Sequence, residues 1–401
     1  MICTFRVDLL HADKSSNTDR TYVLDVSRLV WRGWTGRLPT GIDRVCLAYV
    51  AHFGAASLAM IQRGPHRIIL DARGSAALFA LLARGGANFR HQLVRLLARA
   101  PFRRHRGGLA GKVYLNIGHT GLDEPSLSGW LRKCGMRPLF LIHDLIPITH
   151  PQFCRDAEAP RHARRMGHAL DCAAGIIANS QDTLRALQAF AGSAGRTMPP
   201  ATVAWLGVDE LDPASVPASF DRPHFAMVGT IEGRKNHILL LRLWERLAAR
   251  LGDQTPLLVI VGQRGWKADE AISLLERSAV LNSVVREMGR CNDDRLAAIM
   301  RSARALLMPS FAEGFGLPVI EALQRGVPVI ASQLPVFQEV VGAIPLYLDP
   351  GDAAGWEAAI VDFVGQSDER DRQLQAMGAY RAPSWAEHFA KLEALLAGLR
   401  N

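Results

Sequence analysis

The strongest constraint on the fold is an alternation of short apolar, β-branched runs with stretches of helical periodicity. In the first half of the chain, the runs expected to be strands are YVLDVSRLV (22–30), HRIIL (66–70), KVYLNIG (112–118), RPLFLIHD (137–144), AGIIANS (174–180) and ATVAWLG (201–207). In the second half they are HFAMVGT (224–230), PLLVIVG (256–262), SVVREMG (283–289), ARALLMPS (303–310) and VPVIAS (327–332). Apolar strands that alternate with helices are typical of parallel sheets covered on both faces. The sequence therefore predicts an α/β protein built from βαβ units.

One polar segment divides the predicted strands into two series. It is GVDELDPASVPASFDRP (207–223), which also carries prolines. A chain of 401 residues exceeds what one hydrophobic core usually serves. We therefore expect two doubly wound, Rossmann-like domains that face each other across a cleft, one over 1–215 and one over 222–383. The last stretch, SWAEHFAKLEALLAGL (384–399), starts with an N-cap serine and predicts an amphipathic helix.

The cysteines and the hydropathy narrow the class of protein. The six cysteines are scattered and form no CxxC pair, which indicates a reducing compartment without a disulfide framework or a structural zinc site. No apolar run approaches the 18 or more residues of a membrane span, and the N-terminus lacks the apolar core of a signal peptide. We expect a cytoplasmic protein that is soluble or associated with a membrane surface.

Positive charge is concentrated in the first half of the chain. Up to Phe220 there are 27 Lys and Arg against 16 Asp and Glu, whereas the remainder has 20 against 22. No acidic residue lies between Asp71 and Asp123. Arginines alternate with leucines in RGGANFRHQLVRLLARAPFRRHRGG (84–108), which predicts a basic amphipathic helix, and RHARRMGH (161–168) adds a second cluster. These segments are either a solvated face or a surface for an anionic membrane. Nucleic-acid binding is disfavoured because no aromatic platform accompanies the arginines.

The turn VGTIEGRKNH (228–237) is the first candidate site. The predicted strand ends at Gly229, and a helix is expected from about Asn236 or His237. Two adjacent cations, Arg234 and Lys235, fall at the carboxyl end of that strand, where ligands bind in open α/β sheets. They are suited to a diphosphate. The alternative is a solvated basic turn.

The second candidate is PSFAEGFGLPVIEALQRGVPVIAS (309–332), in which two carboxylates flank a glycine loop. Gly314 and Gly316 allow a sharp turn and a close ligand approach, and Pro318 suits the first position of a helix. We expect Glu313 in the loop and Glu321 in the first turn of that helix, both facing one pocket. Carboxylates accept the paired hydroxyls of sugars and ribose. The alternative is a glutamate favoured by the helix dipole plus an unrelated loop glutamate.

The N-terminal half adds three weaker candidates. TGRLPTGIDRV (35–45) is expected between a first strand and a helix, as a ligand-binding glycine loop or as a simple tight turn. His143 and Asp144 follow a predicted strand, where either could line a site or be structural. Ser180, in IIANSQDT, could lie near the cleft or act as a helix N-cap.

V-G-T-I-E-x-R-K-N-H followed by P-S-x-x-E-G-F-G-L-P-x-x-E-A resembles the retaining GT-B glycosyltransferases of family 4. The E-x7-E signature of that family matches Glu313 and Glu321 in type and spacing, and GVPVIAS matches as well. The resemblance implies a GT-B fold in which the last helix (384–401) packs back on the N-terminal domain. Gly233 departs from the proline of many relatives, which is expected to loosen that turn.

The resemblance also implies roles for the matching residues. Arg234 and Lys235 would bind the diphosphate, Glu313 and His143 would contact the donor sugar, and Glu321 would hold the ribose hydroxyls. The first four of these are the catalytic candidates. The remaining donor-binding candidates are Gly41, Ile42, Gly229, Met288, Gly314, Phe315, Gly316 and Leu317. Residues expected on the acceptor side are Asp144, Arg44 and Ser180.

The function implied by the resemblance is retaining transfer of a hexose, with GDP-mannose favoured as donor. The acceptor would be a growing saccharide, linked to a polyprenyl diphosphate at the inner face of the inner membrane, in lipopolysaccharide, capsule or exopolysaccharide synthesis. No metal and no cofactor are expected, since no DxD follows a strand and Asp293–Asp294 is typical of a helix start. The alternatives are a GT-B sugar-nucleotide epimerase and a non-catalytic carbohydrate- or lipid-binding scaffold.

Overall fold

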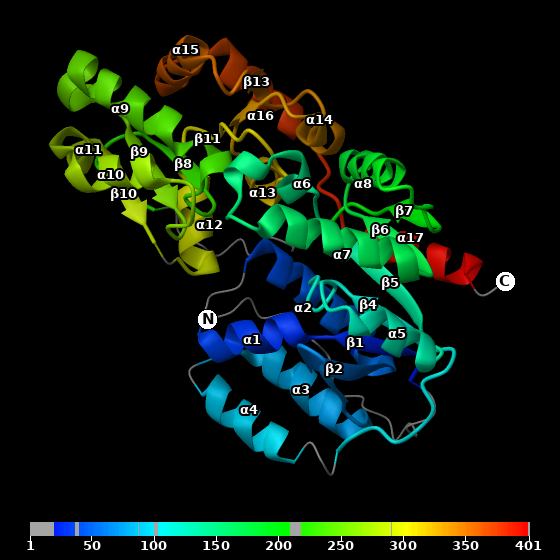
Figure 1. Cartoon of the computed structure of the whole chain (residues 1–401). Coiled ribbons are helices and arrows are strands. Elements are labelled where there is room, and N and C mark those ends of the chain that lie inside the picture. Colours follow the sequence, from blue (N-terminus) through cyan, green and yellow to red (C-terminus); the bar gives the residue numbers. More distant parts are fainter. Residues whose placement is uncertain are drawn as a thin grey trace.

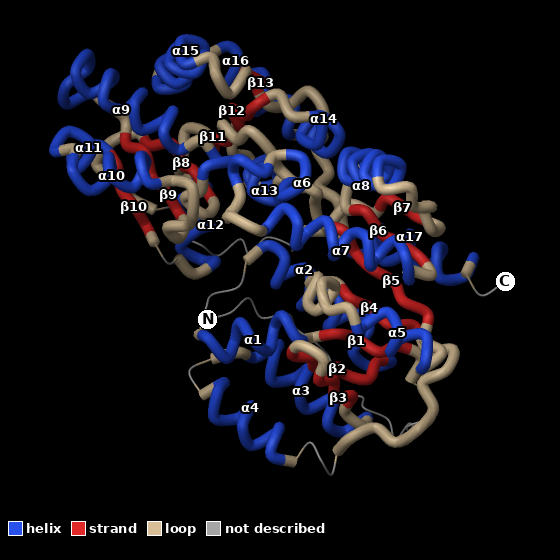
Figure 2. The backbone as a smooth tube through the Cα atoms, in the orientation of Figure 1, coloured by secondary structure: helices blue, strands red, loops and turns tan. Residues whose placement is uncertain are grey.

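Two α/β domains make up the chain in the computed structural model (Figure 1). The structure describes residues 20–36, 40–86, 88–99, 103–208, 218–289 and 291–399. Each domain is built on one sheet, of seven strands in the N-terminal domain and six in the C-terminal domain. Helices cover the faces of both sheets (Figure 2). The predicted fold class is confirmed.

The N-terminal sheet has the strand order β3-β2-β1-β4-β5-β6-β7. Its strands are β1 (Tyr22–Asp25), β2 (Ser57–Arg63), β3 (His66–Ile69), β4 (Val113–Asn116), β5 (Arg137–Ile142), β6 (Gly175–Ala178) and β7 (Ala201–Val203). All neighbouring pairs are parallel except β2 and β3, which form an antiparallel hairpin. The reversal occurs at the edge of the sheet, and the expectation of purely parallel pairing was wrong for β3.

Two sequence predictions in this domain need correction. The strand predicted over 22–30 ends at Asp25, and α1 (Ser27–Thr35) follows. Leu29 and Val30 are buried in the core and belong to this helix. Periodicity alone cannot tell a buried helix from a buried strand in an apolar run this short. The sequence reading also missed β2, whose residues are buried over nearly its whole length. The other helices are α2 (Gly41–Phe53), α3 (Ala72–Arg84), α4 (Phe89–Ala98), α5 (Ser126–Lys133), α6 (Ile146–Thr149), α7 (Glu158–Cys172) and α8 (Gln181–Ser193).

The C-terminal sheet has the order β10-β9-β8-β11-β12-β13, and all its pairs are parallel. Its strands are β8 (His224–Val228), β9 (Leu257–Val261), β10 (Val285–Met288), β11 (Leu306–Met308), β12 (Val329–Ser332) and β13 (Leu346–Leu348). The short edge strand β13 was missed. The helices are α9 (His237–Leu251), α10 (Asp269–Arg277), α11 (Ala279–Val284), α12 (Asp293–Arg301), α13 (Leu317–Gln324), α14 (Pro335–Val341), α15 (Ala353–Val364) and α16 (Asp368–Met377).

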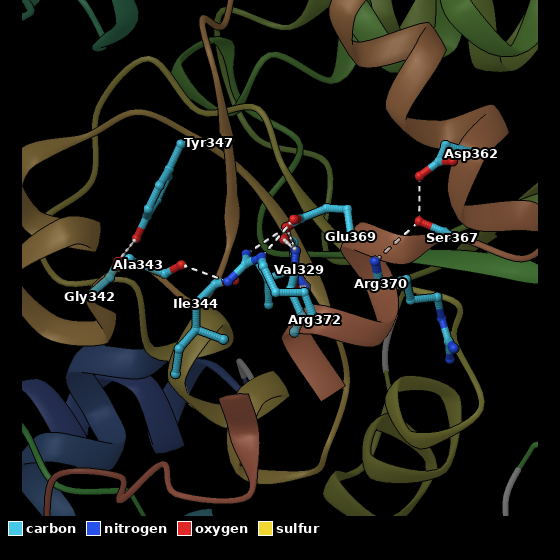
Figure 3. A network of polar contacts seen from close by, with 11 residues as sticks. Val329, Gly342, Ala343, Ile344, Tyr347, Asp362, Ser367, Glu369, Arg370 and Arg372 are labelled. Carbon is cyan, nitrogen blue, oxygen red and sulfur yellow. Dashed lines mark hydrogen bonds and ion pairs between the residues drawn. The ribbon is translucent and has the colours of Figure 1, made fainter. Parts of the chain in front are cut away.

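A network of polar contacts joins α16 to neighbouring segments of the C-terminal domain (Figure 3). Arg372 pairs with Glu369 at 2.6 Å and donates to the carbonyl of Ile344 at 2.8 Å. The side chain of Gln373 is buried and bonds both backbone groups of Val329, at 2.8 and 3.1 Å. These contacts fix the start of β12, the strand that leads into α14 at the domain boundary.

The last helix, α17 (Trp385–Gly398), returns to the N-terminal domain and contacts β6 and β7 (Figure 1). It begins with a capping box between Ser384 and Glu387. The buried His388 lies 2.8 Å from the Tyr49 hydroxyl of α2. The chain therefore crosses between the domains twice, and the two crossings touch where the Val208 N–H donates to the carbonyl of Pro383 at 3.2 Å.

The two basic segments differ in their surroundings. In α4, Phe89 and Leu93 are buried against the core, whereas Val94 is 50% exposed and Arg90 and Arg95 face solvent. In α7, by contrast, Arg161 and Arg165 are held by carboxylates of their own domain, for example Arg161 by Asp123 at 2.6 Å. Among the helices within the described ranges, none is long and apolar enough to cross a membrane.

Candidate active site

The carboxyl edges of the two sheets meet around Gly314. A Cβ at this position would lie 2.6 Å from the carbonyl oxygen of His143 and 3.0 Å from the Cβ of Asp144. The loop after β11 therefore packs directly on the loop after β5, in the other domain, and only glycine permits this approach. The structure thus brings His143, Asp144 and Gly314 together.

The turn after β8 projects two cations toward this junction. Gly229 has φ +139°, and the 3-10 turn η3 (Gly233–Lys235) leads into α9 through Asn236, which has φ +57°. Gly233 was expected to loosen the turn. Instead, a Cβ there would lie 2.6 Å from the carbonyl oxygen of Lys267, so glycine lets another loop pack tightly against the turn.

Glu313 is the centre of a buried charge cluster. Its Oε1 accepts from Lys235 Nζ at 2.7 Å and from the Ser310 hydroxyl at 2.8 Å, and its Oε2 pairs with Arg234 Nη1 at 2.8 Å. The other terminal nitrogen of Arg234 contacts Glu232 at 2.6 Å. All four charged side chains come from two adjacent loops of the C-terminal domain. The cluster holds two cations and two carboxylates, so its net charge is close to zero.

Burial and charge act in opposite directions on this cluster. Burial tends to raise the pKa of Glu313, but Arg234 and Lys235 outweigh it and lower that pKa to about 2. Burial lowers the pKa of Lys235 despite the neighbouring carboxylate. Burial also raises the pKa of Glu232, and the nearby Arg234 offsets only part of this increase. Glu313 is therefore the carboxylate of the cluster that is most firmly ionised.

Glu321 lies in a different environment. It is the fifth residue of α13, not part of the first turn as expected, so its position is not explained by the helix dipole. Its Oε1 accepts from Arg44 Nη1 at 2.8 Å. The Nη2 of the same arginine lies 2.5 Å from Asp293 Oδ1, at the start of α12. Arg44 belongs to α2 of the N-terminal domain, and both carboxylates belong to the C-terminal domain.

The end of the predicted glycine loop, from Thr40 onward, faces α13 from the N-terminal domain, whereas residues 37–39 lie outside the described residues. It follows α1, not the first strand, so that part of the expectation was wrong. Gly41 is the first residue of α2, and a Cβ there would lie 3.4 Å from Leu317 Cδ1. Thr40 and Asp43 form a capping box at this helix end. Gly41 and the partly buried Ile42 thus lie at the domain boundary, beside the start of α13.

His143 and Asp144 are anchored by the backbone around them. His143 is buried, its Nε2 lies 2.7 Å from the carbonyl of Ile117, and burial lowers its pKa to about 4. Asp144 Oδ1 accepts from the N–H of Ile146 at 3.1 Å. A neutral imidazole that donates through Nε2 has its Nδ1 left as an acceptor.

Other predicted residues have local structural tasks. The Ser180 hydroxyl is buried and accepts from the Thr183 N–H at 3.0 Å, so Ser180 is the N-cap of α8. Met288 ends β10, and its carbonyl accepts from the N–H of Gly262 at 3.3 Å. Phe315 is buried, and Gly316 has φ +90° with Phe337 against its Cα, which fixes the start of α13.

Sequence reasoning missed three carboxylates near the domain boundary. Glu232 lies within the quoted TIEGRKNH, but no pattern marks it as a partner of Arg234. Asp293 starts α12, as its sequence context predicts, and it also binds Arg44, which the sequence does not indicate. Glu339, in α14, accepts from the Trp205 indole at 2.8 Å and from two N–H groups at the start of α8, those of Gln181 and Asp182, at 2.7 and 3.1 Å.

Within the part of the chain that the structure describes, no group of three or more His, Cys, Asp or Glu side chains is arranged to hold a metal ion.

The structural comparison defines the class of protein. HepE from Anabaena, in a structure with UDP and glucose, aligns over 94% of this chain and 100% of its own, with a TM-score of 0.65 at 15% identity. Sucrose-phosphate synthase from Thermosynechococcus elongatus aligns over 94% of this chain and 98% of its own, with a TM-score of 0.60 at 17% identity. Likenesses at this level of identity establish the fold, which is GT-B.

The sequence comparison is more specific. Residues 209–379 match the family model "Glycosyl transferases group 1". The serotype-specific mannosyltransferase WbdA of Escherichia coli is 31% identical over 229 residues, which are 52% of this chain and 28% of WbdA. The O-antigen chain mannosyltransferase B of E. coli is 36% identical over 144 residues, 36% of this chain and 37% of that protein. The chain thus has the GT-B fold, its residues 209–379 match the group 1 glycosyltransferase model, and it is similar to O-antigen mannosyltransferases over less than half of their length.

Proposed function

We propose that the protein is a retaining glycosyltransferase that moves a hexose, with mannose favoured, from a nucleoside-diphosphate sugar to a saccharide acceptor. The observation that carries this proposal is the convergence of Arg234 and Lys235 on Glu313 at the carboxyl edge of the C-terminal sheet. Relatives named as mannosyltransferases support the choice of sugar.

Donor binding exchanges the partners within this cluster. The diphosphate takes hydrogen bonds from Arg234 and Lys235, and Glu313 is released toward the hydroxyls of the sugar. Charge-assisted hydrogen bonds of this kind are each worth about 1.5–3 kcal/mol. Arg234 and Lys235 are already paired with Glu232 and Glu313. The diphosphate therefore replaces an existing carboxylate partner of these cations.

In the transfer step, the bond between the anomeric carbon and the phosphate oxygen breaks, and its electron pair leaves with the diphosphate. Arg234 and Lys235 stabilise the charge that develops there. The acceptor oxygen forms its bond to the same face of the anomeric carbon, and its proton passes to the departing phosphate. These residues supply the positive charge, so a resident metal ion or cofactor is not required by the proposal. His143, which is held neutral, is suited to accept a hydrogen bond from a sugar hydroxyl.

The test is a transfer assay with GDP-mannose, UDP-glucose and dTDP-rhamnose as donors and an O-antigen-type lipid-linked saccharide as acceptor. Replacing Glu313 with Gln keeps the shape of the side chain but removes its charge, and we expect kcat/KM to fall by about 100-fold or more, as for loss of one oriented polar group in an active site. The control is Glu393→Gln, an exposed carboxylate of α17. Near-native turnover of Glu313→Gln would overturn the assigned role, and epimerisation of the donor without transfer would favour an epimerase.

We further propose that the acceptor is lipid-linked and that the protein works at an anionic membrane surface. The exposed arginines of α4 support this for the segment 84–108, whereas 161–168 is mostly engaged within its own domain. Sedimentation with vesicles of anionic phospholipid should weaken when Arg90 and Arg95 are replaced by Gln. The matched control is Arg161→Gln with Arg165→Gln, which should leave sedimentation unchanged. Equal binding by all variants would rule out this surface.

A further inference from the structure

Arg44 reaches across the domain boundary and holds the carboxylate that the proposed function assigns to ribose. Its two terminal nitrogens are used separately: Nη1 contacts Glu321 at 2.8 Å and Nη2 contacts Asp293 at 2.5 Å. The three side chains are 32%, 12% and 43% exposed, so Glu321 is the least accessible member. A guanidinium divided in this way can give up one partner and keep the other.

Little room remains beside Glu321 in this arrangement. Arg44, Leu317, Val208 and Trp385 line a cavity of about 20 Å³ next to its carboxylate. A cavity of this volume holds about one water molecule. This cavity has no room for a ribose ring, and Arg44 Nη1 already occupies Glu321 Oε1 at 2.8 Å.

We propose that Arg44 is a positioning residue that competes with the nucleoside ribose for Glu321 and so weakens nucleotide binding to the donor-free protein. The proposal rests on the assignment of Glu321 to the ribose in the proposed function. When the ribose takes Glu321, Nη1 of Arg44 is released while Nη2 stays with Asp293, so the domains remain linked around the bound nucleotide. A phosphate group that lacks a ribose does not need Glu321 and is not subject to this competition.

The contact between Glu339 and the start of α8 is separate from this competition. It joins α14 to α8, whereas Arg44 joins α2 to α12 and α13 (Figure 1). Three donors of the N-terminal domain converge on this one carboxylate. Release of Arg44 from Glu321 therefore leaves another polar link between the domains in place.

The experiment compares two probes by calorimetry on the full chain. The first is the tightest-binding of GDP, UDP and dTDP, and the second is inorganic pyrophosphate, which has no ribose. We expect Arg44→Gln to lower the Kd of the nucleoside diphosphate about tenfold relative to that of pyrophosphate, which corresponds to about 1.4 kcal/mol. The ratio is the informative quantity, because loss of a positive charge weakens both anions alike.

A double variant tests whether the effect passes through Glu321. In the Glu321→Gln background, Arg44→Gln should no longer change the ratio. Should Arg44→Gln fold poorly, Arg44→Lys is the substitute; a single ammonium cannot span both carboxylates, and about a threefold change is expected. An unchanged ratio, or a nucleoside diphosphate that binds more weakly relative to pyrophosphate, would overturn the competition.

The Kd values of the single variants separate the ribose assignment from the competition. If Glu321→Gln alone leaves the Kd of the nucleoside diphosphate unchanged, the ribose assignment in the proposed function is wrong. If Glu321→Gln weakens binding but Arg44→Gln does not strengthen it, the ribose assignment stands and Arg44 is not its competitor.

Discussion

Glu313 and Glu321 are eight residues apart in one motif, yet the fold gives them opposite surroundings. Glu313 is buried, and its partners Arg234 and Lys235 come from the same domain. Glu321 lies at the domain boundary, and its cation comes from the other domain. Two glutamates of one motif can therefore differ in burial and in the origin of their cationic partners. The contacts of Glu313 form within the C-terminal domain, whereas the contact of Glu321 with Arg44 depends on how the two domains pack together.

The largest expected difference concerns stability. Glu313→Gln leaves the buried Lys235 and Arg234 without their common carboxylate, and breaking a buried ion pair costs about 3–5 kcal/mol. Glu321→Gln affects a partly exposed pair, for which we expect about 1 kcal/mol or less. Urea unfolding of both variants at pH 7 measures the two free energies. Equal losses would mean that the two carboxylates are held alike, which contradicts the comparison.

The second prediction uses pH to separate the two carboxylates. The folded-state pKa of Glu313 is about 2, below its ordinary value of 4.5, so its contribution is present above pH 4.5 and is lost as the pH falls toward 2. The full shift is worth about 3 kcal/mol. The free energy of unfolding of Glu313→Gln should therefore fall less steeply than that of the native protein over this range. Parallel curves would show that other groups dominate acid unfolding.

The third prediction moves the comparison to the domain boundary itself. Glu339→Gln retains one acceptor oxygen but removes the charge that receives three N–H groups of the N-terminal domain. We expect a cost of about 1–2 kcal/mol and a larger radius of gyration in small-angle X-ray scattering. The matched control is Glu357→Gln in α15, whose partners Arg246 and Arg250 lie within its own domain. Domain opening by the control as well would contradict the assignment.

The smallest effect is expected for Asp293→Asn. Asp293 is 43% exposed, and it contributes one contact to Arg44 and a favourable charge at the start of α12. Both contributions are modest, and together they amount to about 1 kcal/mol. Thermal unfolding followed by circular dichroism should detect a small shift. A loss as large as that of Glu313→Gln would show that the boundary is as strongly coupled as the buried cluster.

Much of the C-terminal domain could be predicted from the sequence, because its motifs lie in local turns. Strand β8, the cations after it and the start of α9 at His237 all follow from one stretch of fourteen residues, 224–237. The contacts of Arg44 were beyond reach, since they join residues separated by 249 and 277 positions. The same holds for Glu339, whose partners lie 134 to 158 residues away. Local patterns specify elements, whereas a boundary between domains depends on how those elements pack.

The errors in the fold have a similar cause. VSRLV after β1 has the composition of a strand, and only the packing of Leu29 and Val30 on the sheet shows that it is helical. Strand β13 is short and only partly buried, so it lacks the continuous apolar run that reveals a central strand.

The double crossing of the chain also constrains how the domains can move. Two domains joined by a single segment can rotate freely about it, whereas two adjacent connecting segments limit the relative rotation of the domains. Here Val208 is tied to Pro383, and Gly207 lies so close to Trp385 that a Cβ there would be 2.3 Å from its backbone nitrogen. The two crossings are thereby held together at one place. Truncation before α17 would detach the second crossing from the N-terminal domain and remove the contacts of α17 with β6 and β7.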